Sequence, residues 1–265
     1  MYIKFNYCPS GELCKIILRE SEFKEKGKNI YKENEEEVIN CLEKYISEDG
    51  NIDGTRLKDD WFTISKKDVF ISHSHKDIEK VKVFAGWLHE VFGLNVFIDS
   101  CTWGCCDELL KKIDDKYCRK NNSRAYDYNL RNYTTSHVHM MLSIALTEMM
   151  NNAECIIFFN TPTSINMSYE LESIKGNKKT ASPWIFHELM MTTMLKISIP
   201  KRIMKINESY SRNMGRIDKS VNIDYDVSQA LKEMKILTDA KLIQWHKEWE
   251  KSSNGNSLDK LYSII

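Results

Sequence analysis

Residues 66–77 read KKDVFISHSHKD, and this stretch decides the fold expected for the chain. Its first part, DVFIS, is a short and mostly apolar run, which is typical of a strand buried on both faces of a parallel sheet. A cluster of hydroxyl and imidazole side chains, Ser72 to His75, follows the run directly. Ser74 with Asp77 three residues later fits a capping box, so a helix is predicted to begin there.

Strand-like and helix-like segments alternate along the chain after residue 67. The predicted strands are 68–72, 94–99, 155–160, 201–206 and 222–227, and the predicted helices are 77–93, 107–117, 137–153, 182–196 and 228–249. This alternation predicts an α/β fold in which helices cover both faces of a doubly wound parallel sheet. The run at 155–160 is almost wholly apolar and predicts a central strand.

Residues 1–65 are predicted to form a small α+β N-terminal extension. Two short strands are expected at 1–7 and 14–20, a helix at 35–49 and a turn-rich junction at 48–60. The predicted domain bounds are therefore 1–65 for the extension, 66–250 for the α/β domain with a helical C-terminal end, and 251–265 for a tail.

Composition excludes several classes of function. The chain has 265 residues, and its Lys+Arg and Asp+Glu counts are both 38, whereas nucleic-acid binders usually carry a basic surplus. No apolar run reaches the length of a membrane span, and the first residues do not resemble a signal peptide. We therefore expect a cytoplasmic protein that binds neither nucleic acid nor membrane.

The cysteines and histidines do not predict a metal site. Without an export signal, the eight cysteines are expected to be reduced thiols. Cys101, Cys105 and Cys106 lack the short, repeated spacing of zinc ligands. His137 and His139 are two apart on a predicted helix that Ser136 is expected to cap, so their side chains point apart.

Three polar segments follow predicted strands and should meet at one edge of the sheet. They are residues 72–75, 99–103 and 160–163. Ligands of doubly wound sheets bind at the carboxyl ends of the strands, so this edge is the predicted ligand site.

The helix predicted at 182–196 carries the candidate catalytic group. Ser182 is expected to be its N-cap and Pro183 its first residue. Glu188 is the only carboxylate in this apolar helix, and Trp184 one turn earlier shares its face. A lone acid in such surroundings is a candidate catalytic residue, although composition alone favours a solvated or ion-paired carboxylate.

Other motifs for nucleotide binding or hydrolysis are absent. The sequence contains neither G-x-G-x-x-G after a strand, nor a P-loop, nor the G-x-S-x-G of a nucleophile elbow. A long polar connection is predicted at 118–136, rich in arginine and tyrosine. It could hold a diphosphate and stack a base, or it could be a solvated surface loop.

Three segments, taken in this order, resemble TIR (Toll/interleukin-1 receptor) domains. DVFISHSHKD resembles the first-strand motif of the family, and LNVFIDS at 94–100 looks like its second strand running into the BB loop. SPWIFHEL at 182–189 looks like the helix that carries the catalytic glutamate of NAD-cleaving members. The resemblance covers roughly residues 66–200 and is strongest to bacterial anti-phage proteins of the Thoeris type.

This resemblance implies a flavodoxin-like sheet and NAD+ as a substrate, with no cofactor. Glu188 would be the catalytic acid, and Trp184 would line the nicotinamide side of the pocket. The other residues of the implied substrate-binding set are Ser72, His73, Ser74, Asp99, Trp103 and Ser182, of which Asp99 and Trp103 would belong to the mobile BB region. The product would be a cyclic or conjugated ADP-ribose that signals to a separate effector protein, and the family also implies self-association.

Two other readings remain open. Many TIR domains are adaptors that assemble with other proteins and turn over nothing, and the pairing of Glu188 with Trp184 counts against this class. A nucleoside deoxyribosyltransferase-like glycosylase would use the same architecture and also one glutamate.

Overall fold

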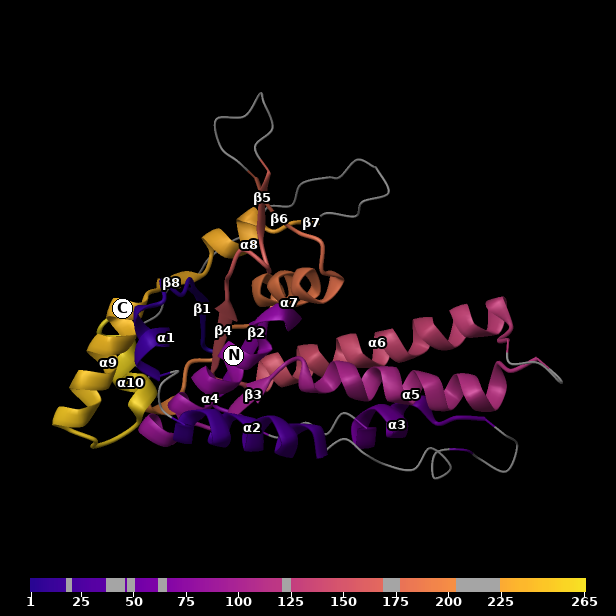
Figure 1. The fold of residues 1–265 in the computed structure, drawn as a ribbon, viewed down its shortest axis with the longest axis horizontal. Helices are drawn as coiled ribbons and strands as arrows, with labels where there is room; N and C mark the ends of the chain where they lie inside the picture. Colours follow the sequence, from indigo (N-terminus) through magenta and orange to yellow (C-terminus); the bar gives the residue numbers. More distant parts are fainter. Residues whose placement is uncertain are drawn as a thin grey trace.

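The central feature of the structure is a five-stranded parallel sheet (Figure 1). The computed structural model describes residues 1–17, 21–36, 46, 51–61, 66–120, 125–168, 177–203 and 225–265. The strands of the sheet, in spatial order, are β3 (Val96–Ile98), β2 (Val69–His73), β4 (Cys155–Phe159), β1 (Ile3–Tyr7) and β8 (Lys235–Leu237). The predicted α/β fold is confirmed, and so is the central place of the strand at 155–160.

The order of the strands matches a flavodoxin-like sheet over one half only. β3, β2 and β4 take the places that such a sheet gives to its second, first and third strands. The next place is occupied by β1, which pairs with β4 on one side and β8 on the other. This part of the expected extension therefore completes the central sheet, while the domain bounds at residues 65 and 250 stay predictions.

Helices cover both faces of this sheet, as a doubly wound fold requires. The α-helices are α1 (Glu12–Ile17), α2 (Ser21–Glu36), α3 (Gly54–Trp61), α4 (Ile78–Phe92), α5 (Cys101–Tyr117), α6 (Tyr128–Asn152), α7 (Pro183–Met194), α8 (Ser228–Lys232), α9 (Asp239–Lys251) and α10 (Ser257–Ser263). Two short 3₁₀ turns, η2 (His75–Asp77) and η3 (Lys201–Ile203), complete the described helical elements.

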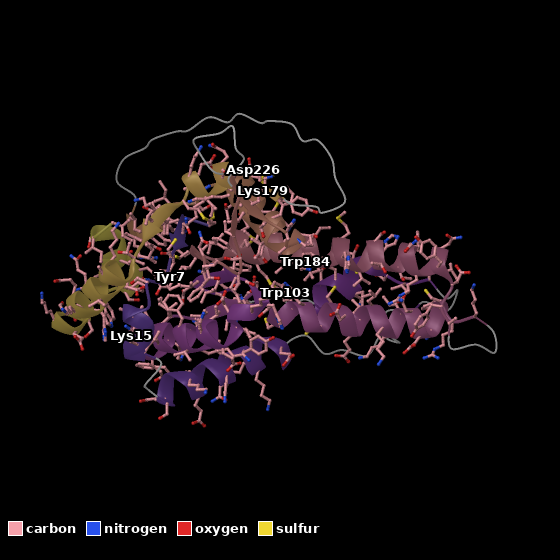
Figure 2. All side chains as sticks on the ribbon, turned by 45° about the horizontal axis from the view of Figure 1, so that its top comes forward. Tyr7, Lys15, Trp103, Lys179, Trp184 and Asp226 are labelled. Carbon is pink, nitrogen blue, oxygen red and sulfur yellow. The ribbon has the colours of Figure 1, made fainter. Side chains whose placement is uncertain are left out.

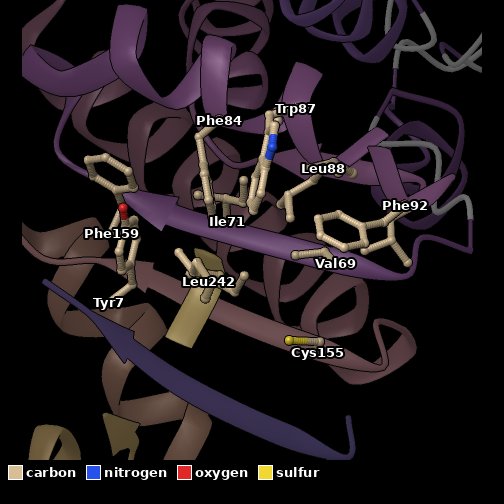
Figure 3. Packing of buried hydrophobic residues seen from close by; sticks show 14 of the residues in the cluster. Tyr7, Val69, Ile71, Phe84, Trp87, Leu88, Phe92, Cys155, Phe159 and Leu242 are labelled. Atoms are coloured by element: carbon tan, nitrogen blue, oxygen red, sulfur yellow. The ribbon is translucent and has the colours of Figure 1, made fainter. Parts of the chain in front are cut away.

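One face of the sheet packs against α4, α9 and α10. Strand residues such as Val69 and Ile71 point to this face, where Phe84 and Trp87 of α4 cover them (Figure 3). Phe92 stacks on Trp245 of α9 with 3.6 Å between ring centroids, so the end of α4 is joined to the C-terminal helices. These aromatic side chains are part of the core on that side.

A close crossing of α2 over α4 depends on two glycines. A Cβ added at Gly27 would overlap the backbone carbonyl of Lys82, and one added at Gly86 would overlap that of Phe23. Backbone meets backbone at both points, so no side chain can be accommodated there. Gly93, with φ of 67°, ends α4 in the left-handed conformation that the sequence predicts for it.

The opposite face of the sheet packs against α5, α6 and α7. Phe70, Phe97 and Ile156 point to this side and are buried under these helices. α5 and α6 continue together well beyond the sheet as a two-helix arm (Figure 1). Above α7, a small antiparallel sheet is formed by β5 (Asn166–Ser168), β6 (Asn177–Thr180) and β7 (Tyr225–Asp226).

Several predicted elements differ from the structure near the start of the chain. The strand expected at 14–20 begins instead as α1, because Leu13 and Ile17 lie one turn apart and are both buried. The turn-rich junction contains α3, whose Leu57 is buried in the core under α6. Most of the helix expected at 35–49 lies outside the described residues.

The arm is the largest difference, because residues 128–136 of the connection predicted at 118–136 are helical. α6 begins at Tyr128 rather than at 137, and Asp127 rather than Ser136 caps it by accepting hydrogen bonds from two backbone amides. Buried Asp114 of α5 accepts hydrogen bonds from Arg131 and Thr134 and so joins the two helices. α5 begins at Cys101 rather than 107, where the BB loop was expected.

The C-terminal part also contains corrections. The helix expected at 228–249 is divided into α8 and α9 by β8, which pairs with β1 at the edge of the sheet. Lys201–Ile203 is a 3₁₀ turn rather than the start of a strand, and residues 204–206 lie outside the described part. The strand predicted at 222–227 is present as β7, but it belongs to the small sheet.

Candidate functional site

Glu188 lies at the carboxyl ends of β2 and β3, where the sequence predicts the ligand site. α7 crosses the end of β2, and Ser182 caps this helix by accepting a hydrogen bond from the amide of Ile185. Only 1% of Glu188 is exposed, and its Oε2 accepts a 2.5 Å hydrogen bond from Oγ of Ser72. The predicted association of Glu188 with the strand end is therefore present in the structure.

Asp99, which directly follows β3, lies in the same cluster as Glu188 and Ser72. Its Oδ2 accepts a hydrogen bond from the amide of His73, and its Oδ1 lies 2.5 Å from Nδ1 of His73 without hydrogen-bond alignment. The other imidazole nitrogen, Nε2, is 3.2 Å from Oγ of Ser100. All three residues are buried, so the imidazole is enclosed by the loop that follows β3.

Burial sets the protonation of this cluster. The pKa of Glu188 is raised by burial and, second, by the charge of Asp99, while the bond from Ser72 opposes the rise. Burial also raises the pKa of Asp99 and lowers that of His73 to about 4. The imidazole is therefore neutral at pH 7, and the two carboxyls hold a proton in preference to carrying two charges.

Unpaired polar atoms gather at this site. Within the described part of the chain, the buried side-chain atoms without a hydrogen-bond partner are His73 Nδ1, Asp99 Oδ1, Trp103 Nε1 and Glu188 Oε1. A proton shared between the two carboxyls would satisfy one oxygen of each. Unpaired buried groups are costly, so their concentration makes this cluster the candidate ligand site of the described residues.

Trp103 lies between the cluster and the surface. Its ring stacks on His73 at 5.9 Å between centroids and is tilted against exposed His75 at 6.1 Å. Trp103 belongs to the first turns of α5, not to a loop, so the mobile BB segment implied by the TIR resemblance is a helix here.

The remaining predicted residues lie around the cluster rather than in it. Trp184 packs against the core under α6 and meets His139 edge-on at 5.5 Å (Figure 2). Ser182 uses its hydroxyl in the helix cap. Ser74 is buried, and it precedes η2 without the side-chain cap that the capping box predicts. No described contact joins these three residues to Glu188, so their substrate-binding roles stay predictions.

The third polar segment is joined to the first by Asp77. This buried carboxylate accepts 2.5 Å hydrogen bonds from the hydroxyls of Thr161 and Thr163. Burial opposes ionisation of Asp77, but these bonds and Lys80 outweigh it and lower the pKa of the carboxyl. Asp77 thus fixes the loop after β4 beside the end of β2, a role that the sequence does not reveal.

Ser100 is the contact residue that sequence reasoning did not single out. It lies inside the predicted rim segment 99–103, but a serine after a strand is common and carries no signal of its own. Only the position of the His73 ring, set by the sheet, gives its hydroxyl a partner.

The described residues contain neither a metal-ligand cluster nor a membrane-spanning helix. No three His, Cys, Asp or Glu side chains there are grouped so that they could hold a metal ion. No described helix combines the length and apolar character that crossing a bilayer needs.

Glu188→Gln should make the protein more stable than wild type at neutral and alkaline pH. A carboxyl whose pKa is raised by folding binds its proton more tightly in the native state, so native stability falls as pH rises above about 4, the unfolded value. The neutral amide removes that loss. We expect a gain on the order of 2 kcal/mol near pH 8 that vanishes near pH 4, measured by urea unfolding at several pH values. A gain independent of pH would contradict the buried, protonated carboxyl.

Comparisons of the chain with protein-family models, with curated proteins and with solved structures find no match.

Proposed function

We propose that the protein cleaves the nicotinamide–ribose bond of NAD+, with Glu188 as the catalytic carboxylate. The observation that carries this proposal is the place of Glu188: a buried carboxyl at the carboxyl edge of a parallel sheet, held by Ser72 and paired with the carboxyl of Asp99. A ribose hydroxyl is a donor that would suit a carboxyl oxygen at this place. The resemblance of three segments to NAD-cleaving TIR domains supports the same assignment.

The reaction depends on a fixed negative charge rather than on a general acid. The nicotinamide of NAD+ is cationic, and it leaves neutral when its bond to the ribose breaks, so no proton has to be delivered to it. The ribose carbon becomes an oxocarbenium ion, and a fixed carboxylate stabilises that developing charge. Glu188 would supply the charge and orient the ribose.

The carboxyl pair suits a cationic substrate. Asp99 and Glu188 together carry one charge when they share one proton, and burial disfavours a second charge. A bound pyridinium ring favours ionisation of the pair, because an opposite charge nearby lowers the pKa of a carboxyl. The site would then be most negative when the substrate is in place. Trp103 and Trp184 are the indoles available to stack on the cation, which requires Trp103 to move.

The fate of the ADP-ribosyl group follows from what attacks it. Water gives ADP-ribose, while a ring nitrogen of the adenine or another nucleophile gives a cyclic or conjugated product. By its resemblance to Thoeris-type TIR proteins, the chain would make such a product as a messenger for a separate effector in anti-phage defence. NAD+ would be a substrate, and no further cofactor is needed.

Two other functions compete with this proposal. A TIR-like adaptor would act through assembly with partner proteins and would not need an acid buried at the strand ends. A nucleoside deoxyribosyltransferase-like enzyme would use Glu188 on a nucleoside, and the geometry around Glu188 suits it as well.

The deciding experiment offers NAD+ and nucleosides to the purified chain and resolves products by chromatography and mass. We expect nicotinamide release from NAD+, with a product mass that distinguishes hydrolysis from cyclisation or conjugation. Release of a nucleobase from nucleosides without nicotinamide release would favour the glycosylase. If NAD+ stays intact both here and in lysate of phage-infected cells, the adaptor is the better description.

A further inference from the structure

The two-helix arm exposes an apolar stripe on α6. Its residues recur at intervals of three and four along one side of the helix, and they are Leu130, Tyr133, His137, Met140 and Ile144, called the α6 stripe below. Tyr133 is 65% exposed and Met140 61% exposed, and the ring of Tyr133 lies against that of His137. This spacing is that of a seam between two helices, whereas the buried side of α6 already contacts α5 and the sheet.

The stripe carries almost no charge. α6 has 25 residues, of which only Arg131 and Glu148 are formally charged at neutral pH. Arg131 is bound to Asp114 and Glu148 to Lys58, so both charges have partners within the chain. Depletion of charge together with exposed tyrosine and methionine is typical of the centre of a protein interface. Two identical copies of such a face would meet without repulsion.

The stripe is large enough for a specific contact with a second copy. It extends about 21 Å along the helix. The exposed area of its residues is on the order of 500 Å² per chain, so two copies would bury roughly 1,000 Å², which is the lower limit for a specific interface. Polar side chains beside the stripe would add to this area.

We infer that the α6 stripe is the contact surface of a homodimer in which two α6 helices pack antiparallel. The stripe is nearly symmetric about His137, so a two-fold axis there places Leu130 opposite Ile144 and Tyr133 opposite Met140 of the second copy. Because the arm projects beyond the sheet, antiparallel packing sets the two sheets at opposite ends of the helix pair (Figure 1). This inference does not rest on the proposed reaction.

The test is sedimentation velocity of the full chain over a roughly hundred-fold range of protein concentration. Wild type is expected to sediment as a dimer at the upper end. Met140→Glu and Tyr133→Glu should each raise the dimer dissociation constant by about 100-fold, because a charge is placed in the centre of the contact. Ile236→Glu is the matched control: Ile236 is 63% exposed, lies on β8 away from the arm, and should leave the mass unchanged.

A wild type that stays monomeric, or a dimer that survives both stripe variants, overturns the inference. The inference is also overturned if Ile236→Glu raises the dimer dissociation constant as much as the stripe variants do. The three substituted side chains are exposed, and circular dichroism of each variant checks that the fold is retained. A photo-crosslinking amino acid in place of Leu130 tests the orientation: linkage to the segment around Ile144 is expected, and linkage to residue 130 of the second copy overturns the antiparallel arrangement.

Discussion

Replacing Glu188 by Gln should lower nicotinamide release from NAD+ by about 10³-fold, which is the size of effect expected when a buried group that stabilises transition-state charge is lost. The amide keeps the shape of the side chain and can still accept the hydrogen bond from Ser72, so the fold and the proposed ribose contact are retained. Only the ability of this side chain to ionise is removed. The measurement is the initial rate of release by wild type and variant at equal protein concentration.

Two further variants separate this charge effect from others. Ser72→Ala keeps the carboxyl group of Glu188 but removes its hydrogen-bond donor. We expect the rate of nicotinamide release to fall by about tenfold, which corresponds to the loss of one hydrogen bond to a charged group. Glu79→Gln changes an exposed carboxylate on α4 that is paired with Lys82 and should leave the rate unchanged. If Glu188→Gln retained wild-type turnover, Glu188 would not be the catalytic group and the proposed reaction would lose its main support.

Gly86→Ala should destabilise the protein by about 3 kcal/mol, because overpacking a buried backbone crossing forces two helices apart. The new methyl group would overlap the carbonyl of Phe23 and lie 2.9 Å from the amide nitrogen of Gly27. Backbone atoms cannot rotate away as a side chain would, so α2 has to shift relative to α4. For a chain of this size the loss corresponds to a drop of roughly 10 °C in Tm.

Gly104→Ala is the matched control for this substitution. Gly104 also lies within a helix, α5, but the nearest atom to its added Cβ is a flexible carboxylate oxygen of Glu35 at 3.8 Å. Alanine is the better helix former, so a gain of about 0.5–1 kcal/mol is expected. Urea unfolding of the two variants beside wild type measures both effects. Equal stability of the two variants would show that the close crossing of α2 and α4 is not a constraint.

The parts of the fold that could be predicted from the sequence depend on neighbouring residues. β2 begins with an apolar run and β4 is apolar throughout. The end of α4 is set by Gly93, and the start of α7 by Ser182. Each of these signals lies within a few residues of the element that it determines. These signals were sufficient to predict the α/β class and the parallel arrangement of the central strands.

The elements that escaped prediction depend on distant partners. β8 is only three residues long and interrupts a sequence with helical character, and it becomes a strand by pairing with β1. The first turns of α6 are polar and read as a loop, but Asp127 caps them and Asp114 binds Arg131. Contacts of this kind have no signature in a single stretch of sequence.

The candidate site was predicted in outline for a topological reason. Parallel strands bring their carboxyl ends together, so Ser72 and Asp99 were expected near one another, and α7 supplied Glu188. The pairing of Asp99 with Glu188, and the imidazole between Asp99 and Ser100, depend on side-chain directions at three separate elements. Those side-chain directions are set by packing and cannot be predicted from the sequence.

The place of β1 in the sheet has a consequence for the order in which the chain can fold during translation. β1 leaves the ribosome first, but its two neighbours, β4 and β8, are synthesised more than a hundred residues later. β2 and β3 are separated by one helix and can pair as soon as they emerge. β1 therefore exposes both hydrogen-bonding edges until β4 appears, and sequence-distant pairing of this kind folds slowly and invites aggregation. A nascent chain of this protein should depend on chaperones until β4 is complete.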